Sequence, residues 1–168
     1  THEMLEEQRA KSKLAKELID ADAAARLALI AEQDHRIDAD VLALLNAIVR
    51  SASAQEDAAF AEKAVQARDA VMQCSTAGKR AQAQKEEMEI AARDLEALGN
   101  QFNLDALVTL VASAPSLDRV TALAALGWQL MDYGFFQKLT ERVERAAGSE
   151  RERLGSIRDR ALVEIQRI

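Results

Sequence analysis

One short segment has the residue types and spacing of a metal site. Glu32 and His35 form a Glu-x-x-His pattern, which places both side chains on one helix face in carboxylate-bridged di-iron bundles. Such a site needs a second Glu-x-x-His pair and further helical carboxylates, yet the only other histidine is His2, in a charged N-terminal stretch. We therefore expect Glu32 and His35 to be surface residues at a helix end, and we expect no metal or other cofactor.

Two further positions resemble parts of catalytic or ligand-binding motifs. Gly78, Lys79 and Arg80 are similar to the end of a phosphate-binding loop, but no glycine precedes them at the required spacing. Cys74 has no base or metal-binding neighbour, so we expect a small buried hydrophobic residue near a helix end. None of the 28 acidic residues has an apolar surround that would raise its pKa. The sequence predicts a protein that is not an enzyme.

The most unusual chemical feature is a cluster of aromatic residues. Four of the six aromatic side chains, Trp128, Tyr133, Phe135 and Phe136, lie within nine residues. Large aromatic side chains usually form the core where two helices meet, but Trp and Tyr are also enriched at the centres of protein interfaces. Phe135 and Phe136 are consecutive and cannot both point to the same side of one helix. Both roles stay open, and these four residues are the candidate partner-binding site.

The elements that must position these residues are helices. Hydrophobic residues make up 49% of the chain and are mostly Ala and Leu, with six Gly and one Pro. A β-rich chain would need more β-branched and aromatic residues, separated by turn residues. A length of 168 residues fits a single domain with one continuous core. We expect an all-α domain over 1–168, an irregular bundle or α-hairpin array of about seven or eight helices.

Capping residues and stop signals divide the chain into these helices. Residues 1–13 are mostly charged and are expected to be frayed or mobile, and a stripe from Leu14 to Leu29 predicts a long first helix. The predicted N-caps of later helices are Asp38 or Asp40, Ser53 with Glu56 as a capping box, Asn103, Ser116, and Ser149 with Glu152 as a second box. The predicted stops are Gly78, Gly99 with Asn100, Pro115 and Gly148.

Two short segments are similar to each other. Arg68-Asp69-Ala70-Val71-Met72 ends one predicted helical hairpin, and Arg158-Asp159-Arg160-Ala161-Leu162 ends another. The distance between them is too long for the ~34-residue period of a tetratricopeptide array.

The last helix carries an apolar stripe that suits packing against another helix, so an oligomerisation segment that pairs with its own copy is one alternative. The stripe consists of Leu154, Ile157, Ala161, Ile165 and Ile168.

Charge and hydropathy exclude two classes of partner. The net charge of -6 should repel the phosphate backbone of a nucleic acid. The longest nearly uncharged stretch, 120–131, is shorter than the ~20 residues that span a bilayer.

Because the chain opens on Thr1 and its last helix has no stop signal, we expect a fragment of a longer protein. A lone cysteine fits a reducing, intracellular compartment.

Parts of the chain resemble helical segments of large cyanobacterial and related bacterial proteins. These segments often lie beside tetratricopeptide or CHAT-type protease domains, and uncharacterised helical proteins of photosynthetic organisms look similar. The resemblance covers about half the chain, from Asp38–Leu45 through Arg68–Val71 and from Asp132–Phe136 through Glu150–Leu154. It implies a non-catalytic interaction region in a bacterial cytoplasm or a plastid stroma, and it transfers no functional residue.

The leading functional hypothesis is a protein-interaction or scaffold module that acts by helix packing. Its partners would be proteins, docked on an apolar patch or on the open terminal helices. Two alternatives remain: an enzyme or cofactor-binding bundle, which would need a buried polar cluster, and a homo-oligomerisation segment that uses the C-terminal helix.

Overall fold

The computed structural model describes residues 1–99 and 102–168, and within these ranges it is entirely helical. The described part holds nine α-helices and two short 3-10 helices, η1 and η3, with no strand. In chain order these are α1 His2–Asp20, α2 Ala23–Glu32, η1 Asp34–Arg36, α3 Ala39–Ala54, α4 Ala58–Cys74, α5 Thr76–Leu98, α6 Leu104–Ala112, α7 Leu117–Gly127, η3 Trp128–Leu130, α8 Tyr133–Arg145 and α9 Gly148–Arg167. The all-α class is confirmed, and the helix count exceeds the expected seven or eight.

The additional helix arises near Asp22. The predicted single helix from Leu14 to Leu29 is wrong, because Ala21 has an extended backbone (φ -68°, ψ 149°) and Asp22 caps a new helix. The Asp22 carboxylate accepts a hydrogen bond from the backbone N–H of Ala25 at 2.8 Å. Asp competes well for backbone donors at N-caps, so a single aspartate in an Ala-rich run can end one helix and begin the next.

Three predicted N-caps are confirmed. Asp38, Asn103 and Ser116 accept hydrogen bonds from backbone N–H groups three residues later, at 3.0, 2.8 and 3.3 Å respectively. These caps depend only on a local spacing between a side-chain oxygen and the first turn of a helix. Such signals can therefore be recognised in the sequence alone.

Both predicted capping boxes are wrong. Ser53 lies inside α3, where its hydroxyl donates to the Val49 carbonyl oxygen at 2.9 Å, and Asp57 caps α4 instead. Ser149 lies inside α9, and the N-cap of this helix is Ala147. A serine hydroxyl can bond back to a carbonyl four residues earlier, so serine in a helix does not by itself mark a start.

Gly78 also has a role other than the predicted one. It lies within α5, near the junction where Ser75 accepts the Gly78 N–H at 2.9 Å and donates to the Val71 carbonyl at 2.7 Å. A Cβ at Gly78 would collide with the Val71 carbonyl oxygen and lie 2.6 Å from the Met72 Cα. This glycine therefore permits the close approach of α5 to the end of α4.

The other predicted stops lie at or next to helix ends. Gly148, with a left-handed φ of 63°, is the first residue of α9 and does not end the preceding helix, which stops at Arg145. Gly99, with φ 34°, follows α5. Pro115 follows the end of α6. Asn100, which was paired with Gly99 in the prediction, lies outside the described residues.

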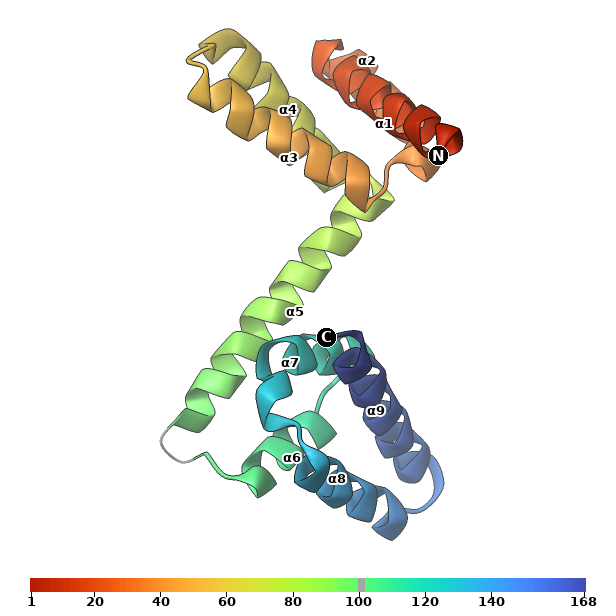
Figure 1. Cartoon of the computed structure of the whole chain (residues 1–168), viewed down its shortest axis with the longest axis vertical. Helices are drawn as coiled ribbons and strands as arrows, with labels where there is room; N and C mark the ends of the chain where they lie inside the picture. Colours follow the sequence, from red (N-terminus) through yellow and green to blue (C-terminus); the bar gives the residue numbers. More distant parts are fainter. Residues whose placement is uncertain (100–101) are drawn as a thin grey trace. The chain divides into compact units, whose positions relative to one another are not determined.

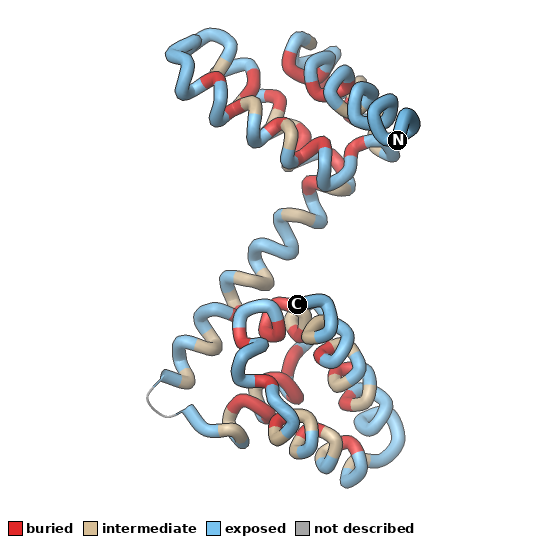
Figure 2. The backbone as a smooth tube through the Cα atoms, in the orientation of Figure 1, coloured by how far each residue is buried: buried red, intermediate tan, exposed pale blue. Residues whose placement is uncertain are grey.

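The described residues form two compact units, 1–83 and 84–168, and each has its own buried core. The expected continuous core is thus divided into two clusters (Figure 2). The reason lies in α5, where five consecutive residues, 82–86, are all exposed. Five residues exceed one helical turn, so this part of α5 packs on no side. This division does not test the expected single domain over 1–168, because α5 belongs to both units.

The two units repeat the same order of elements. Unit 1 (1–83) has α1, α2, η1, α3 and α4, and unit 2 (84–168) has α6, α7, η3, α8 and α9 after the second part of α5 (Figure 1). In each unit the last two of these helices pack together as a hairpin. The repetition accounts for the two similar sequence segments, since Arg68 pairs with Asp69 in α4 and Arg158 pairs with Asp159 in α9.

The buried residues of the two units also repeat in register. Through η1 and α3 the counterpart in unit 2 stands 93 or 94 positions later, and in α4 it stands 90 positions later. The buried pairs are Leu14 and Leu107, Ala15 and Val108, Leu18 and Val111, Ile19 and Ala112, Ile30 and Leu123, Ile37 and Met131, Val41 and Phe135, Leu45 and Leu139, Val49 and Val143, Ala64 and Leu154, Ala67 and Ile157, and Val71 and Ala161. This register defines corresponding positions below.

Candidate functional site

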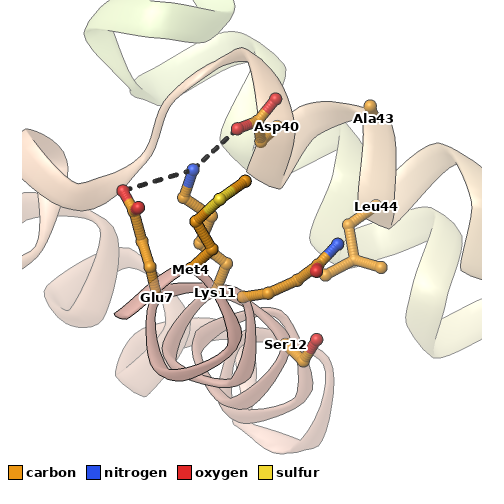
Figure 3. A pocket seen from close by; sticks show the side chains of 8 residues that line it. Met4, Glu7, Lys11, Ser12, Asp40, Ala43 and Leu44 are labelled. Carbon is orange, nitrogen blue, oxygen red and sulfur yellow. Dashed lines mark hydrogen bonds and ion pairs between the residues drawn. The ribbon is translucent and has the colours of Figure 1, made fainter. Parts of the chain in front are cut away.

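A groove runs between α1 and α3 of unit 1. It consists of two adjoining hollows of about 440 and 460 Å³ that share Ser12 and Leu44. The first is lined by Met4, Glu7, Gln8, Lys11, Ser12, Asp40, Ala43 and Leu44 (Figure 3), and the second by Ser12, Lys16, Ile19, Asp20, Leu44, Ile48, Ser51, Ala52, Gln55 and Phe60. We call the two together the α1–α3 groove. Along α1 it extends from Met4 to Asp20, which is about 24 Å at 1.5 Å per residue.

The groove has an apolar end and a polar end. Its apolar end is formed by Ile19, Ile48 and Phe60, and Phe60 is 38% exposed. At the opposite end Met4 is 67% exposed beside the polar side chains of α1. Singly exposed apolar side chains are common on protein surfaces, but apolar side chains that line one continuous groove are typical of binding sites.

Lys11 is the centre of the polar end. Its Nζ lies 2.6 Å from an Asp40 oxygen and 3.8 Å from Glu7 (Figure 3). It also lies 3.1 Å from an Asp38 oxygen. The hydrogen bonds to Asp40 and Asp38 raise the pKa of Lys11 above its ordinary range. Burial alone would raise the pKa of Asp38, but hydrogen bonds from the Val41 N–H and from Lys11 outweigh it and hold that pKa low. Lys11 therefore stays charged and ties α1 to the N-terminus of α3.

Residue choice explains why the groove is open. In unit 2 two polar contacts cross from α8 to α6: Lys138 Nζ lies 2.6 Å from Asp105, and Arg142 donates to the Thr109 hydroxyl at 2.7 Å. Lys138 lowers the pKa of the Asp105 carboxyl through that hydrogen bond. In unit 1 the corresponding positions of α3 are Leu44 and Ile48, which cannot form such contacts. At these positions the helix pair is bridged in unit 2 and lined by apolar groups in unit 1, whose polar bridge from Lys11 lies only at the N-terminus of α3.

Unit 2 has a hollow at the place that matches the apolar end of the groove. It measures about 390 Å³ and is lined by Ala112, Ser113, Arg142, Arg145, Ala146, Glu150, Arg153 and Leu154. In the common register Arg142 replaces Ile48, Arg145 replaces Ser51 and Glu150 replaces Phe60. We call it the arginine hollow. Arg153 donates two hydrogen bonds to Glu150, at 3.0 and 2.7 Å, and these lower the pKa of Glu150 and raise that of Arg153.

The structure divides the four candidate aromatic residues into two groups. Phe135 is completely buried and makes an edge-to-face contact with the half-buried Phe136, with ring centroids 5.0 Å apart. Trp128 is 43% exposed and Tyr133 is 82% exposed. Phe135 belongs to the core of unit 2, whereas Trp128 and Tyr133 are accessible to a partner. Leu126 and Leu130 are similarly exposed in the same segment.

The residues of the motif fragments do not form a common site. Glu32 ends α2, His35 lies in η1, and both are exposed. Among the described residues no three His, Cys, Asp or Glu side chains are grouped closely enough to hold a metal ion. Cys74 is exposed rather than buried, because it lies on the solvent side of the last turn of α4. Lys79 and Arg80 lie on the exposed surface of α5.

The sequence stripe of the last helix is used within unit 2. Leu154, Ile157 and Ala161 are buried in its core, and Ile165 packs against that core. Ile168 is exposed, as are Leu162 and Val163 on another side of α9. Most of the stripe that suggested pairing between copies therefore has a partner inside the chain.

Arg26, a buried arginine that was not among the predicted site residues, stabilises unit 1. Arg26 of α2 donates from Nε to the Leu18 carbonyl at 2.7 Å, and from Nη2 to the carbonyls of Ile19 and Ala21 at 3.1 and 3.0 Å. The last carbonyls of a helix have no partners within that helix, and a cation there also interacts well with the helix dipole. The available signal was one arginine within the apolar run of α2, just after the break at Asp22.

Asp34 was missed as well. Its carboxylate accepts from the N–H of Thr76 at 2.8 Å and from the Thr76 hydroxyl at 2.7 Å, so it connects η1 to the first turn of α5. The hydroxyl contributes most to lowering the pKa of Asp34, followed by the N–H. The two residues are 42 positions apart, and no local pattern relates them.

None of the helices in the described ranges combines the length and apolar character that crossing a membrane requires. The candidate sites on the described surface are the α1–α3 groove, the arginine hollow and the exposed segment around Trp128.

Protein-family models, curated proteins and solved structures give no match to this chain.

Proposed function

We propose that this protein is a non-catalytic interaction module that binds an amphipathic helix of a partner protein in the α1–α3 groove. The observation that supports this most is the apolar lining of the groove at Leu44 and Ile48, where unit 2 has bridging polar side chains. A groove between two helices that exposes apolar side chains along one line suits a third helix.

The dimensions of the groove define the partner segment. A length of about 24 Å corresponds to about 16 helical residues, or between four and five turns. Its apolar residues would recur at i, i+3 or i+4, and i+7, because these positions share one helix face. They would pack on Leu44, Ile48 and Phe60, while polar residues at the other end would meet Lys11 and Asp40.

A second surface for the same function is the segment around Trp128. Trp128 and Tyr133 are both exposed, and Trp and Tyr are the residue types that most often dominate interface energies. Neither residue lines the α1–α3 groove or the arginine hollow, so we rank this surface below the groove. A partner bound here would leave the groove residues unaffected, and mutations can therefore separate the two surfaces.

The proposal can be tested with a pair of substitutions that copy unit 2 into unit 1. Ser12→Asp with Leu44→Lys introduces the counterparts of Asp105 and Lys138, which bridge α6 and α8. A displayed library of helical 18-residue sequences is selected on the wild-type protein, and the selected peptides are then measured against the variant. A matched control is Ala23→Asp with Asn46→Lys, which adds the same charges at exposed positions outside the groove.

We expect selected peptides to show the i, i+3 or i+4, i+7 apolar pattern and to bind the wild type with a dissociation constant of about 1–10 μM. Ser12→Asp with Leu44→Lys should weaken binding at least tenfold, and the control should retain it. Peptides without helical periodicity, or peptides that bind all three proteins equally, would show that the groove is not the docking site.

A further inference from the structure

The arginine hollow of unit 2 concentrates positive charge in a protein whose net charge is -6. Three arginines line it, Arg142, Arg145 and Arg153, together with one acidic residue, Glu150. The lining therefore carries a net charge of +2, from three positive groups and one negative group. The hydroxyl of Ser113 adds a neutral hydrogen-bonding group.

Two of the three guanidinium groups are held in place by their own contacts. Arg142 is fixed by the hydrogen bond from Nη2 to the Thr109 hydroxyl at 2.7 Å. Arg153 is fixed by its two hydrogen bonds to Glu150. A guanidinium has five N–H donors, so both residues keep donors free for a ligand. Among the described residues, Arg145 has no hydrogen-bond or ion-pair partner.

The helix dipole does not account for the three arginines together. Cations in the last turn of a helix interact well with its dipole, and this could account for Arg142 and Arg145 in α8. However, the corresponding helix α3 has no basic residue in its last turn and repeats the same buried register. The dipole also gives no reason for Arg153, which lies near the start of α9. The three arginines come from two helices and line the same hollow.

We propose that the arginine hollow binds a phosphomonoester group. A phosphomonoester carries a charge of about -1.5 to -2 at pH 7, which matches the +2 of the lining. Planar guanidinium groups bind phosphate oxygens in pairs of parallel hydrogen bonds. A single carboxylate would leave half of the positive charge unmatched. The phosphate could belong to a small metabolite or to a phosphorylated side chain, and both present the same chemistry.

The test is a titration of the isotopically labelled full chain, followed by amide chemical shifts. The probes are inorganic phosphate, glycerol 3-phosphate, phosphoserine and sulfate. We expect the shifts to centre on Ser113, the end of α8 and the first turns of α9, with a dissociation constant of about 1 mM for inorganic phosphate. Tighter binding of glycerol 3-phosphate would identify a small metabolite as the source, and tighter binding of phosphoserine would identify a side chain.

The pH dependence separates a phosphate site from general attraction of anions. The second pKa of a phosphomonoester is near 6, so the affinity for phosphate should fall several-fold between pH 7.5 and 5.5. Sulfate keeps its charge over this range, so its binding should change little. Equal changes for phosphate and sulfate would contradict the proposed charge match.

Arg145→Gln is the most informative variant, because Arg145 is exposed and its loss should not affect folding. We expect it to weaken phosphate binding about tenfold. Arg151→Gln removes the same charge from an exposed position of α9 outside the hollow and should change the affinity less than twofold. Equal effects of the two variants, or shifts centred elsewhere, would overturn the proposal. Peptide binding to the α1–α3 groove is measured separately, so this inference can fail without affecting the proposed function.

Discussion

Units 1 and 2 share an order of helices and a buried register. They differ at one surface, which lies between α1 and α3 in unit 1 and between α6 and α8 in unit 2. Unit 1 places Leu44 and Ile48 there, and unit 2 places Lys138 and Arg142. The core positions keep their apolar character in both units, although the individual side chains change, as with Val41 and Phe135. The difference shows that the fold depends on the buried register, whereas the groove-facing positions are free to take different binding properties.

A second difference concerns one arginine position. Arg26 in unit 1 donates to the carbonyls at the end of α1, whereas its counterpart Arg119 pairs with Glu87 and Asp94 of α5. The second part of α5 also reaches α7 in unit 2, where Leu95 lies next to Gly127. The same residue type thus supports a helix end in one unit and a neighbouring helix in the other.

The largest expected effect is a loss of stability in core variants, and it should distinguish the core of unit 1 from that of unit 2. Phe135→Ala should lower the stability of unit 2 by about 3–5 kcal/mol, because it leaves a large cavity at a completely buried position. Val41→Ala, at the matching position, should cost unit 1 about 2 kcal/mol. Scanning calorimetry should show two transitions, each shifted by only one of the variants. If both variants shift one common transition, the units unfold as a single domain over 1–168.

The arginine pair should give the next largest effect. Arg26→Ala leaves the carbonyls of Leu18, Ile19 and Ala21 without these donors, so we expect a loss of about 2–3 kcal/mol. Arg119→Ala removes a partly exposed ion pair and should cost about 1 kcal/mol. Denaturant unfolding measures both. A smaller loss for Arg26→Ala than for Arg119→Ala would contradict the role of Arg26 at the end of α1.

The exposed aromatic residues should affect stability less. If Trp128 were a core residue, Trp128→Ala would cost about 3–5 kcal/mol. At 43% exposure we expect about 1–2 kcal/mol, and for Tyr133→Ala, at 82% exposure, less than 0.5 kcal/mol. Thermal unfolding of the two variants tests this order. A Tyr133→Ala variant that melts below Trp128→Ala would contradict the greater exposure of Tyr133.

The smallest effect is a pH dependence at Asp34. Because the pKa of Asp34 is lowered from its ordinary 3.8 in the folded chain, its stabilising contribution is complete above that value. It should be lost as the pH falls from about 4 through the lower folded pKa. Asp34→Asn should therefore flatten the dependence of the melting temperature on pH below about 4. Glu32→Gln, an exposed control, should leave the dependence as in the wild type.

Local signals in the sequence predicted local structure well. The helical class and the caps at Asp38, Asn103 and Ser116 depend on composition or on short spacings, and all are confirmed. The break at Asp22 was missed because aspartate also occurs within helices. The division into two cores was missed because each apolar stripe looks the same whether it faces one core or two.

The candidate site was much less predictable than the fold. The α1–α3 groove depends on side chains about 30 positions apart, such as Ser12 and Leu44, and on the lack of a polar bridge between them. A pattern within one helix predicts neither which distant side chains meet in the groove nor whether a polar pair bridges them. The aromatic cluster was visible in the sequence, but its spacing could not show that Phe135 is buried while Tyr133 is exposed.

The most direct test of the account is to map a bound helical peptide on the isotopically labelled chain. A peptide selected on the wild-type protein should shift amide signals along 4–20 and 40–60, and Ser12→Asp with Leu44→Lys should abolish these shifts. The corresponding residues of unit 2, around Asp105 and Lys138, should not respond. Shifts centred on unit 2, or on the segment around Trp128 and Tyr133, would contradict the claim that the open groove of unit 1 is the docking site.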